Sequence, residues 1–110
     1  MKKKTFVLDF FGEAVTLALT TEHYSADNTL AVEAIDVDED EPFATITVNM
    51  GPLARPLLTD KNMAFVKNWS ENGWVDDFLK AHPEIATPTD TTVDNGFVTA
   101  RAWQFHPENF

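Results

Sequence analysis

The chain has 110 residues, enough for one domain, and 44% of them are hydrophobic, so it can build a core of its own. It contains no cysteine, which excludes a disulfide scaffold, a cysteine nucleophile, a thiolate zinc site and an iron–sulfur cluster. Eighteen acidic residues against eight lysines and arginines give a net charge of −10, which disfavours direct binding to nucleic acid or to an anionic membrane.

The segment Met1 to Lys4 is basic, with three lysines, but it is not followed by a long apolar segment. No segment approaches the roughly 18 apolar residues of a membrane-spanning helix. We therefore expect a protein of the cytoplasm, without a secretory signal.

The first half of the chain predicts four strands. Residues 5–11 are rich in aromatic and β-branched types, and residues 14–21 alternate between apolar and small or polar types, as in a half-buried antiparallel strand. Residues 29–37 and 43–50 continue the series, with turn residues between the strands. Short connections between consecutive strands favour an antiparallel meander.

Helical signals follow a connector at residues 51–56. Asp60 is a suitable N-cap for a helix over 61–72, in which Phe65 and Trp69 are four residues apart. A second short helix is predicted over 74–82, because it has acids in its first turn and bases in its last.

The C-terminal part of the chain predicts one more strand, at residues 97–105, after the turn signal Asn95-Gly96. The threonine-rich residues 86–94 fit either a loop or an edge strand. The expected fold is therefore one α+β domain over residues 1–110, a twisted antiparallel sheet of about five strands (ββββ-αα-β) with one or two helices packed on one face.

Two segments carry a resemblance: residues 23–32, His-Tyr-Ser-Ala-Asp-Asn-Thr-Leu-Ala-Val, and residues 41–49, Glu-Pro-Phe-Ala-Thr-Ile-Thr-Val-Asn. Together they resemble a family of small acidic bacterial proteins of uncharacterised function that are often carried on conjugative or other mobile elements. The resemblance covers residues 5–50 and implies a biological context, because small acidic proteins on mobile DNA often counter host defence. It implies no particular activity.

The charges are distributed very unevenly along the chain. The fifty residues from Thr5 to Ala54 contain no lysine or arginine, whereas outside them eight bases balance eight acids. The window therefore carries the whole net charge, on ten acids: Asp9, Glu13, Glu22, Asp27, Glu33, Asp36, Asp38, Glu39, Asp40 and Glu41.

An anionic surface of this kind can imitate a nucleic-acid backbone. Carboxylates on alternate strand residues lie roughly 6.7 Å apart, and DNA carries a phosphate about every 3.4 Å along one strand. We therefore expect a non-enzymatic inhibitor of a basic host protein, such as a CRISPR effector or restriction enzyme. The candidate partner-binding residues are Glu22, Asp27, Glu33, Asp36, Asp38, Glu39, Asp40 and Glu41. The alternative is that these acids only keep the protein soluble.

The acidic run also resembles the start of a calcium-binding loop, with Asp36, Asp38 and Asp40 at positions 1, 3 and 5. The pattern then fails, because Glu41 stands where glycine belongs and Thr47 where glutamate belongs. We expect a solvated turn here, and neither a metal nor another cofactor.

Catalytic signals are weak. The histidines have no metal-ligand spacing, the serines lie in no nucleophile elbow, and the four glycines are scattered, so no phosphate loop is present. We expect no enzyme.

A second hypothesis is a structural or regulatory interaction module, as a monomer or a homodimer, that uses exposed aromatic residues or an edge strand. In Phe10-Phe11, one ring must leave the apolar face, because adjacent strand residues point in opposite directions. Arg101 and Trp103 share a face with Phe97 and Phe105 if the last strand is regular. That face is either a partner contact or part of the core.

Overall fold

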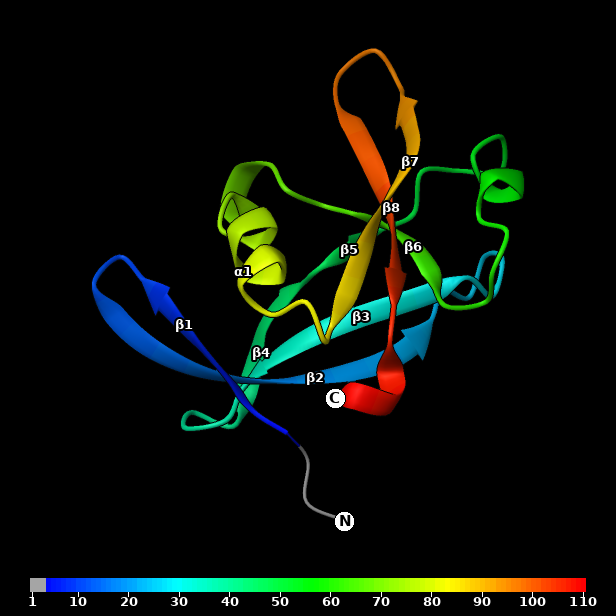
Figure 1. The fold of residues 1–110 in the computed structure, drawn as a ribbon. Coiled ribbons are helices and arrows are strands. Elements are labelled where there is room, and N and C mark those ends of the chain that lie inside the picture. Colours follow the sequence, from blue (N-terminus) through cyan, green and yellow to red (C-terminus); the bar gives the residue numbers. More distant parts are fainter. Residues whose placement is uncertain (1–3) are drawn as a thin grey trace.

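The computed structural model describes residues 4–110, so of the basic N-terminal residues only Lys4 is included. These described residues form two antiparallel sheets and one α-helix (Figure 1). Sheet A has the order β1-β2-β3-β4 and sheet B the order β5-β6-β8-β7. The strands are β1 (Phe6–Phe10), β2 (Glu13–His23), β3 (Leu30–Asp36), β4 (Glu41–Thr45), β5 (Thr47–Val48), β6 (Met63–Val66), β7 (Ala86–Asp94) and β8 (Thr99–Phe105). The helix is α1 (Val75–Ala81), and short 3₁₀ turns lie at η1 (Arg55–Leu57), η2 (Ser70–Asn72) and η3 (Pro107–Asn109).

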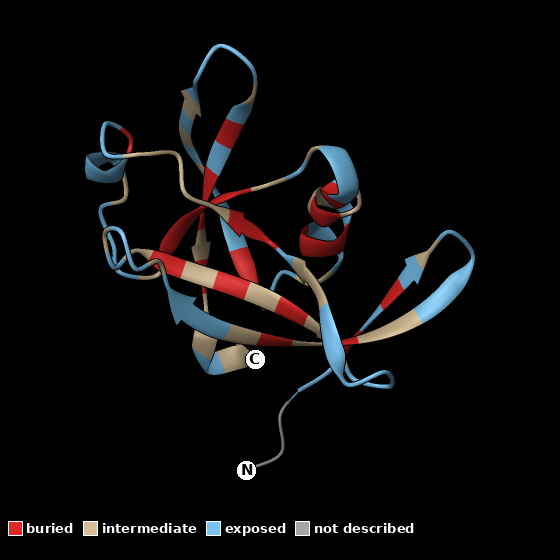
Figure 2. Ribbon diagram, turned by 180° about the vertical axis from the view of Figure 1, so that it is seen from behind, coloured by how far each residue is buried: buried red, intermediate tan, exposed pale blue. Residues whose placement is uncertain are grey.

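Sheet A is the predicted antiparallel meander. In β2 the side chains of Leu17 and Leu19 are buried, which confirms the alternation read from the sequence. In β3 buried and partly exposed residues alternate along the strand (Figure 2). One face of sheet A therefore packs on the core, and the other carries mainly polar and small residues, together with Val7 and Ile35.

The predicted fourth strand, residues 43–50, is divided between the two sheets. β4 pairs with β3, whereas β5 pairs with β6. Between them the Ile46 amide donates to the Val32 carbonyl at 2.9 Å, and the Ile46 carbonyl accepts from the Lys67 amide at 2.8 Å. A strand that passes from one sheet to the next in this way forms the corner between two packed sheets, so the prediction of a single sheet of about five strands is wrong.

The predicted helix over 61–72 is also wrong. All four residues of β6 are buried, and a short apolar segment that is buried on both faces has no periodicity to separate a strand from a helix. The Asp60 carboxylate accepts a hydrogen bond from the Asn62 amide at 2.8 Å and so forms a turn, not a helix cap.

The other C-terminal predictions are largely confirmed. α1 lies inside the predicted second helix, with Val75, Phe78 and Leu79 buried. Residues 86–94, for which the sequence left a choice, form an edge strand, and β8 lies inside the predicted last strand. The part of the chain that the structure describes is thus mainly antiparallel β-structure with one α-helix.

The main core lies between sheet A, sheet B and α1. It joins Leu17 and Val32 of sheet A to Val66, Trp103 and other buried residues of sheet B. A second cluster covers the opposite face of sheet B, where Ala54 and partly buried residues of the 49–58 connector pack on β6 and β8. Figure 1 shows the hairpins β1–β2 and β7–β8 projecting away from this centre.

Within residues 4–110, no helix has the length and apolar character needed to cross a membrane.

Candidate functional site

The eight candidate acids are not brought into one strip. Five of them, Asp36, Asp38, Glu39, Asp40 and Glu41, lie at the turn that joins β3 to β4. Glu22 and Asp27 lie at the other end of the β2–β3 hairpin. β3 has seven residues, which at about 3.3 Å per residue separates its ends by about 20 Å.

Glu33 lies between the two groups, on the outer face of sheet A. It is opposite Thr20 of β2 and Thr45 of β4, whereas its chain neighbours Val32 and Ala34 are buried in the core. Glu22, opposite Ala31, is on the same outer face. Imitation of DNA by a strand requires carboxylates at alternate residues on one face. Of the eight candidate acids, only Glu22 and Glu33 are placed on the outer face, on two different strands.

Two of the acids in the β3–β4 turn have a role in the structure of the turn itself. The Asp36 carboxylate accepts the amides of Asp38 and Glu39, both at 3.1 Å, and so holds the turn closed. Asp40 has a left-handed backbone with φ of 53°, which aspartate and asparagine tolerate better than most residues. Asp38, Glu39 and Glu41 are exposed and have no comparable role in the turn.

Two further acids, which the sequence did not include in the site, lie at the same end of sheet A. In a meander the β1–β2 and β3–β4 turns share one end of the sheet, and Asp9 and Glu13 flank the β1–β2 turn. The meander itself was the signal that could have found them. We call the following seven residues the acidic end: Asp9, Glu13, Asp36, Asp38, Glu39, Asp40 and Glu41.

No residue of the acidic end forms an ion pair within the described part of the chain. The ion pair found in residues 4–110 is Lys67–Glu71, with 2.6 Å between Nζ and Oε1, and the ring of His82 lies 3.9 Å from the Glu84 carboxylate. Hydrogen bonding to Lys67 lowers the pKa of Glu71 to about 2. The strands and turns of sheet A, residues 6–45, contain ten acids and no lysine or arginine.

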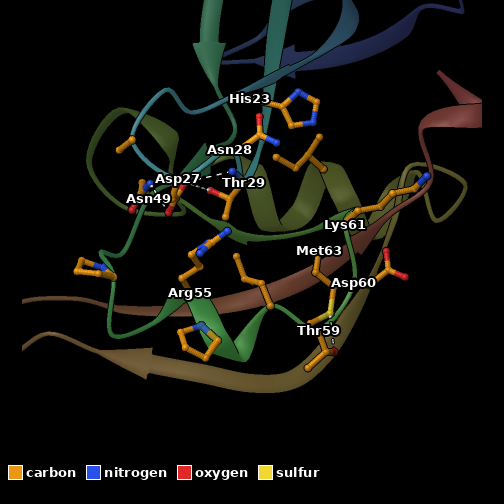
Figure 3. Close-up of a pocket in the computed structure, with 15 residues that line it drawn as sticks. His23, Asp27, Asn28, Thr29, Asn49, Arg55, Thr59, Asp60, Lys61 and Met63 are labelled. Atoms are coloured by element: carbon orange, nitrogen blue, oxygen red, sulfur yellow. Dashed lines mark hydrogen bonds between the residues drawn. The ribbon is translucent and has the colours of Figure 1, made fainter.

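The opposite end of the β2–β3 hairpin forms one wall of an open groove of about 1090 Å³ (Figure 3). The other wall is the connector that carries Arg55, Asp60 and Lys61. In Figure 3 the Arg55 side chain extends toward Asp27 and Thr29. The groove thus mixes cations with anions, which the sequence did not predict.

Asp27 serves as a structural residue in this groove. Its carboxylate accepts the Thr29 hydroxyl at 2.6 Å, the Thr29 amide at 3.1 Å and the Asn49 side-chain amide at 3.1 Å. These hydrogen bonds, led by the one from the Thr29 hydroxyl, lower the pKa of Asp27. The Asn62 amide and the Gln104 side chain lower the pKa of Asp60 in the same way.

A series of aromatic contacts leads from the core to the acidic end. Edge-to-face contacts connect Phe78 to Trp74, Trp74 to Phe43 and Phe43 to Phe10, with ring centroids 5.2 to 5.6 Å apart. Phe11, whose centroid lies 4.7 Å from that of Phe10, completes the series and is 92% exposed. The expectation that one of the two phenylalanines leaves the apolar face is confirmed, although Phe11 lies in the turn and not in the strand.

The face that Trp103 shares with Phe105 belongs to the core, because both side chains are buried. Arg101 is exposed and donates to the Thr89 carbonyl at 2.6 Å. Phe97 lies before β8 in the β7–β8 turn and is exposed. The two phenylalanines Phe11 and Phe97 are therefore the exposed aromatic residues of two different hairpins.

Among residues 4–110, no three histidine, aspartate or glutamate side chains converge in a geometry that holds a metal ion. No protein-family model matches the chain, and neither a curated protein nor a solved structure is found to be similar to it.

Proposed function

We propose that the protein is a non-enzymatic inhibitor, acting in the cytoplasm, that binds a basic host protein through its acidic end. The partner class is a DNA-processing or defence protein, such as a restriction enzyme or a CRISPR effector, whose lysines and arginines otherwise contact DNA. The observation that carries the proposal is the β3–β4 turn, where Asp38, Glu39, Asp40 and Glu41 are consecutive, exposed and without a cation from residues 4–110.

The physical basis is electrostatic. Unpaired carboxylates on a projecting turn attract a cationic surface over roughly a Debye length, about 8 Å at physiological salt, and accelerate the encounter. Contact with Lys and Arg then gives each carboxylate the cationic hydrogen-bonding partner that residues 4–110 do not supply. Glu33, on the open outer face of sheet A, extends this surface away from the turn.

The test is to neutralise the turn without changing its shape. The variant D38N/E39Q/D40N/E41Q removes four negative charges, keeps the side-chain sizes and leaves a residue at position 40 that tolerates a left-handed backbone. Phage plating efficiency is measured on bacteria that carry a restriction or CRISPR system and express the protein. We expect the wild-type protein to raise plating efficiency. The increase caused by the variant should be at least tenfold smaller.

A matched control removes the same charge from other parts of the molecule. The variant D77N/E84Q/D90N/E108Q changes four exposed acids that lie outside sheet A. It should protect phage as well as wild type does. Equal loss in both variants means that net charge alone matters, and no loss in either excludes the β3–β4 turn as the binding surface.

A second candidate function, an interaction module that uses exposed aromatics, is favoured by the exposure of Phe97 and Leu53. The edge strand β7 is less suited to pairing with a partner, because it contains Pro88 and a register shift between Pro88 and Thr92. Binding through apolar contacts should change little with salt. A steep loss of affinity between low and physiological salt supports the acidic end instead.

A further inference from the structure

The turn between β1 and β2 has an unusual residue at its tip. Phe10 pairs with Glu13, so the loop consists of Phe11 and Gly12 alone. Their φ values are 51° and 86°, which is the arrangement of a type I′ hairpin turn. The first position of such a turn favours asparagine, aspartate or glycine, and a bulky aromatic side chain there is strained.

The strain is not compensated by burial. Phe11 touches the ring of Phe10 but remains 92% exposed, so it contributes little to the core. The turn is closed by other groups, since the Asp9 carboxylate accepts the Gly12 amide at 3.0 Å. Neither the turn nor the core therefore needs a phenylalanine at position 11.

The Phe11 ring is also supported from behind by a series of packed aromatic rings. Phe10 beneath it packs on Phe43, which packs on Trp74 beside α1. An exposed ring that is presented by a short turn and supported from behind loses little conformational freedom when it binds, which is the property of interface anchors.

We infer that Phe11 is the apolar anchor of the interface, and that it inserts into a pocket bordered by lysine or arginine on the partner. This inference rests on the proposed function, because the cationic rim of the pocket is assigned from charge complementarity with Asp9, Glu13 and the β3–β4 turn. Guanidinium groups at that rim can stack on the ring as well as pair with the carboxylates.

The test uses peptides from a random library displayed on phage and selected on the immobilised full-length protein. We expect the selected peptides to combine Lys or Arg with an aromatic or aliphatic residue. Their affinity should fall at least tenfold for Phe11→Asn and change less than threefold for Phe11→Trp. The matched control Phe97→Asn, which removes an equally exposed ring from the β7–β8 hairpin, should bind as wild type does.

Thermal unfolding separates lost binding from lost structure. Asn-Gly is a favoured type I′ sequence, so Phe11→Asn should unfold at a temperature no lower than wild type, and higher by about a few degrees. A variant that is more stable and yet fails to bind identifies Phe11 as a contact residue. Peptides that bind Phe11→Asn within threefold of wild type, or that lack basic residues, overturn the inference.

The two proposals fail in different ways. If D38N/E39Q/D40N/E41Q loses the peptides and Phe11→Asn keeps them, the acidic end binds by charge alone and the inference about Phe11 is wrong. If Phe11→Asn loses them and the quadruple variant keeps them, the anchor stands and the β3–β4 turn is not the binding surface.

Discussion

Both ends of the β2–β3 hairpin carry acidic residues, but the carboxylates at the two ends differ in how many hydrogen bonds they accept within the fold. At the groove, Asp27 accepts three hydrogen bonds and lies near Arg55. At the acidic end, Asp9 and Asp36 close turns, while Asp38, Glu39 and Glu41 have neither a cation nor a turn to hold within the described residues. A carboxylate that accepts hydrogen bonds within the fold stabilises the fold. A carboxylate that accepts none is available to bind a partner.

The largest expected effect tests whether the core is packed equally well at both ends of the β2–β3 hairpin. We call the end that lines the groove, with Asp27 and Thr29, the groove end. Leu17 lies opposite Phe6 and Asp36 at the acidic end, Leu30 lies opposite His23 near the groove, and both are buried. Leu17→Ala and Leu30→Ala should each lower the free energy of unfolding by about 2–5 kcal/mol. Urea denaturation measures this, with the exposed Val7→Ala as the control, expected within about 0.5 kcal/mol of wild type. A much smaller effect at Leu17 would mean that the acidic end is loosely packed.

The next effect tests how the groove end is joined to the corner between the sheets. The buried Thr47 hydroxyl accepts the Val32 amide at 3.1 Å and lies 3.0 Å from the Tyr24 hydroxyl. Burial is also the main reason why the pKa of Tyr24 is raised. Thr47→Val keeps the shape but leaves the Val32 amide without a partner, which should lower the free energy of unfolding by about 1–3 kcal/mol. Thr45→Val, at an exposed position of β4, is the matched control. Equal effects at both positions would contradict a role for the hydroxyl.

The sequence predicted local structure better than it predicted which elements meet. The meander followed from alternation in β2 and from short turns, both of which are local signals. The division of residues 43–50 at Ile46 and the strand at Met63–Val66 depend on pairing with distant residues, which a short apolar segment does not encode.

The same limit applies to the candidate site. The acidic run at residues 36–41 could be predicted as a solvated turn because its residues are adjacent. The hydrogen bonding of Asp27 could not, because one of its donors is Asn49, which lies 22 residues later in the chain. The sequence showed how many acids sheet A contains but not which of them make hydrogen bonds within the fold.

A smaller effect concerns pH and the groove end. Folding lowers the pKa of Asp27 and of Asp60 below the usual 3.8. The stability they contribute is therefore complete above that value and is lost as the pH falls through the lower pKa of the folded state. Urea unfolding between pH 7 and pH 3 should show a falling acid limb. The slope should be shallower in Asp27→Asn and intermediate in Asn49→Ala, which removes one of the three donors. An unchanged slope in Asp27→Asn would contradict the structural role of this carboxylate.

The smallest effect concerns salt and the acidic end. Like charges within the acidic end repel one another at low ionic strength, where the Debye length is about 30 Å at 0.01 M, and much less at 0.15 M, where it is about 8 Å. Added sodium chloride should therefore raise the unfolding temperature of the wild-type protein by about a few degrees. The variant D38N/E39Q/D40N/E41Q should start at a higher unfolding temperature in low salt and gain less from added salt. The control D77N/E84Q/D90N/E108Q removes the same net charge but leaves the acidic end intact, so it should keep more of the salt response. If both variants respond alike, the repulsion belongs to the molecule as a whole, and the difference between its two ends is one of hydrogen bonding alone.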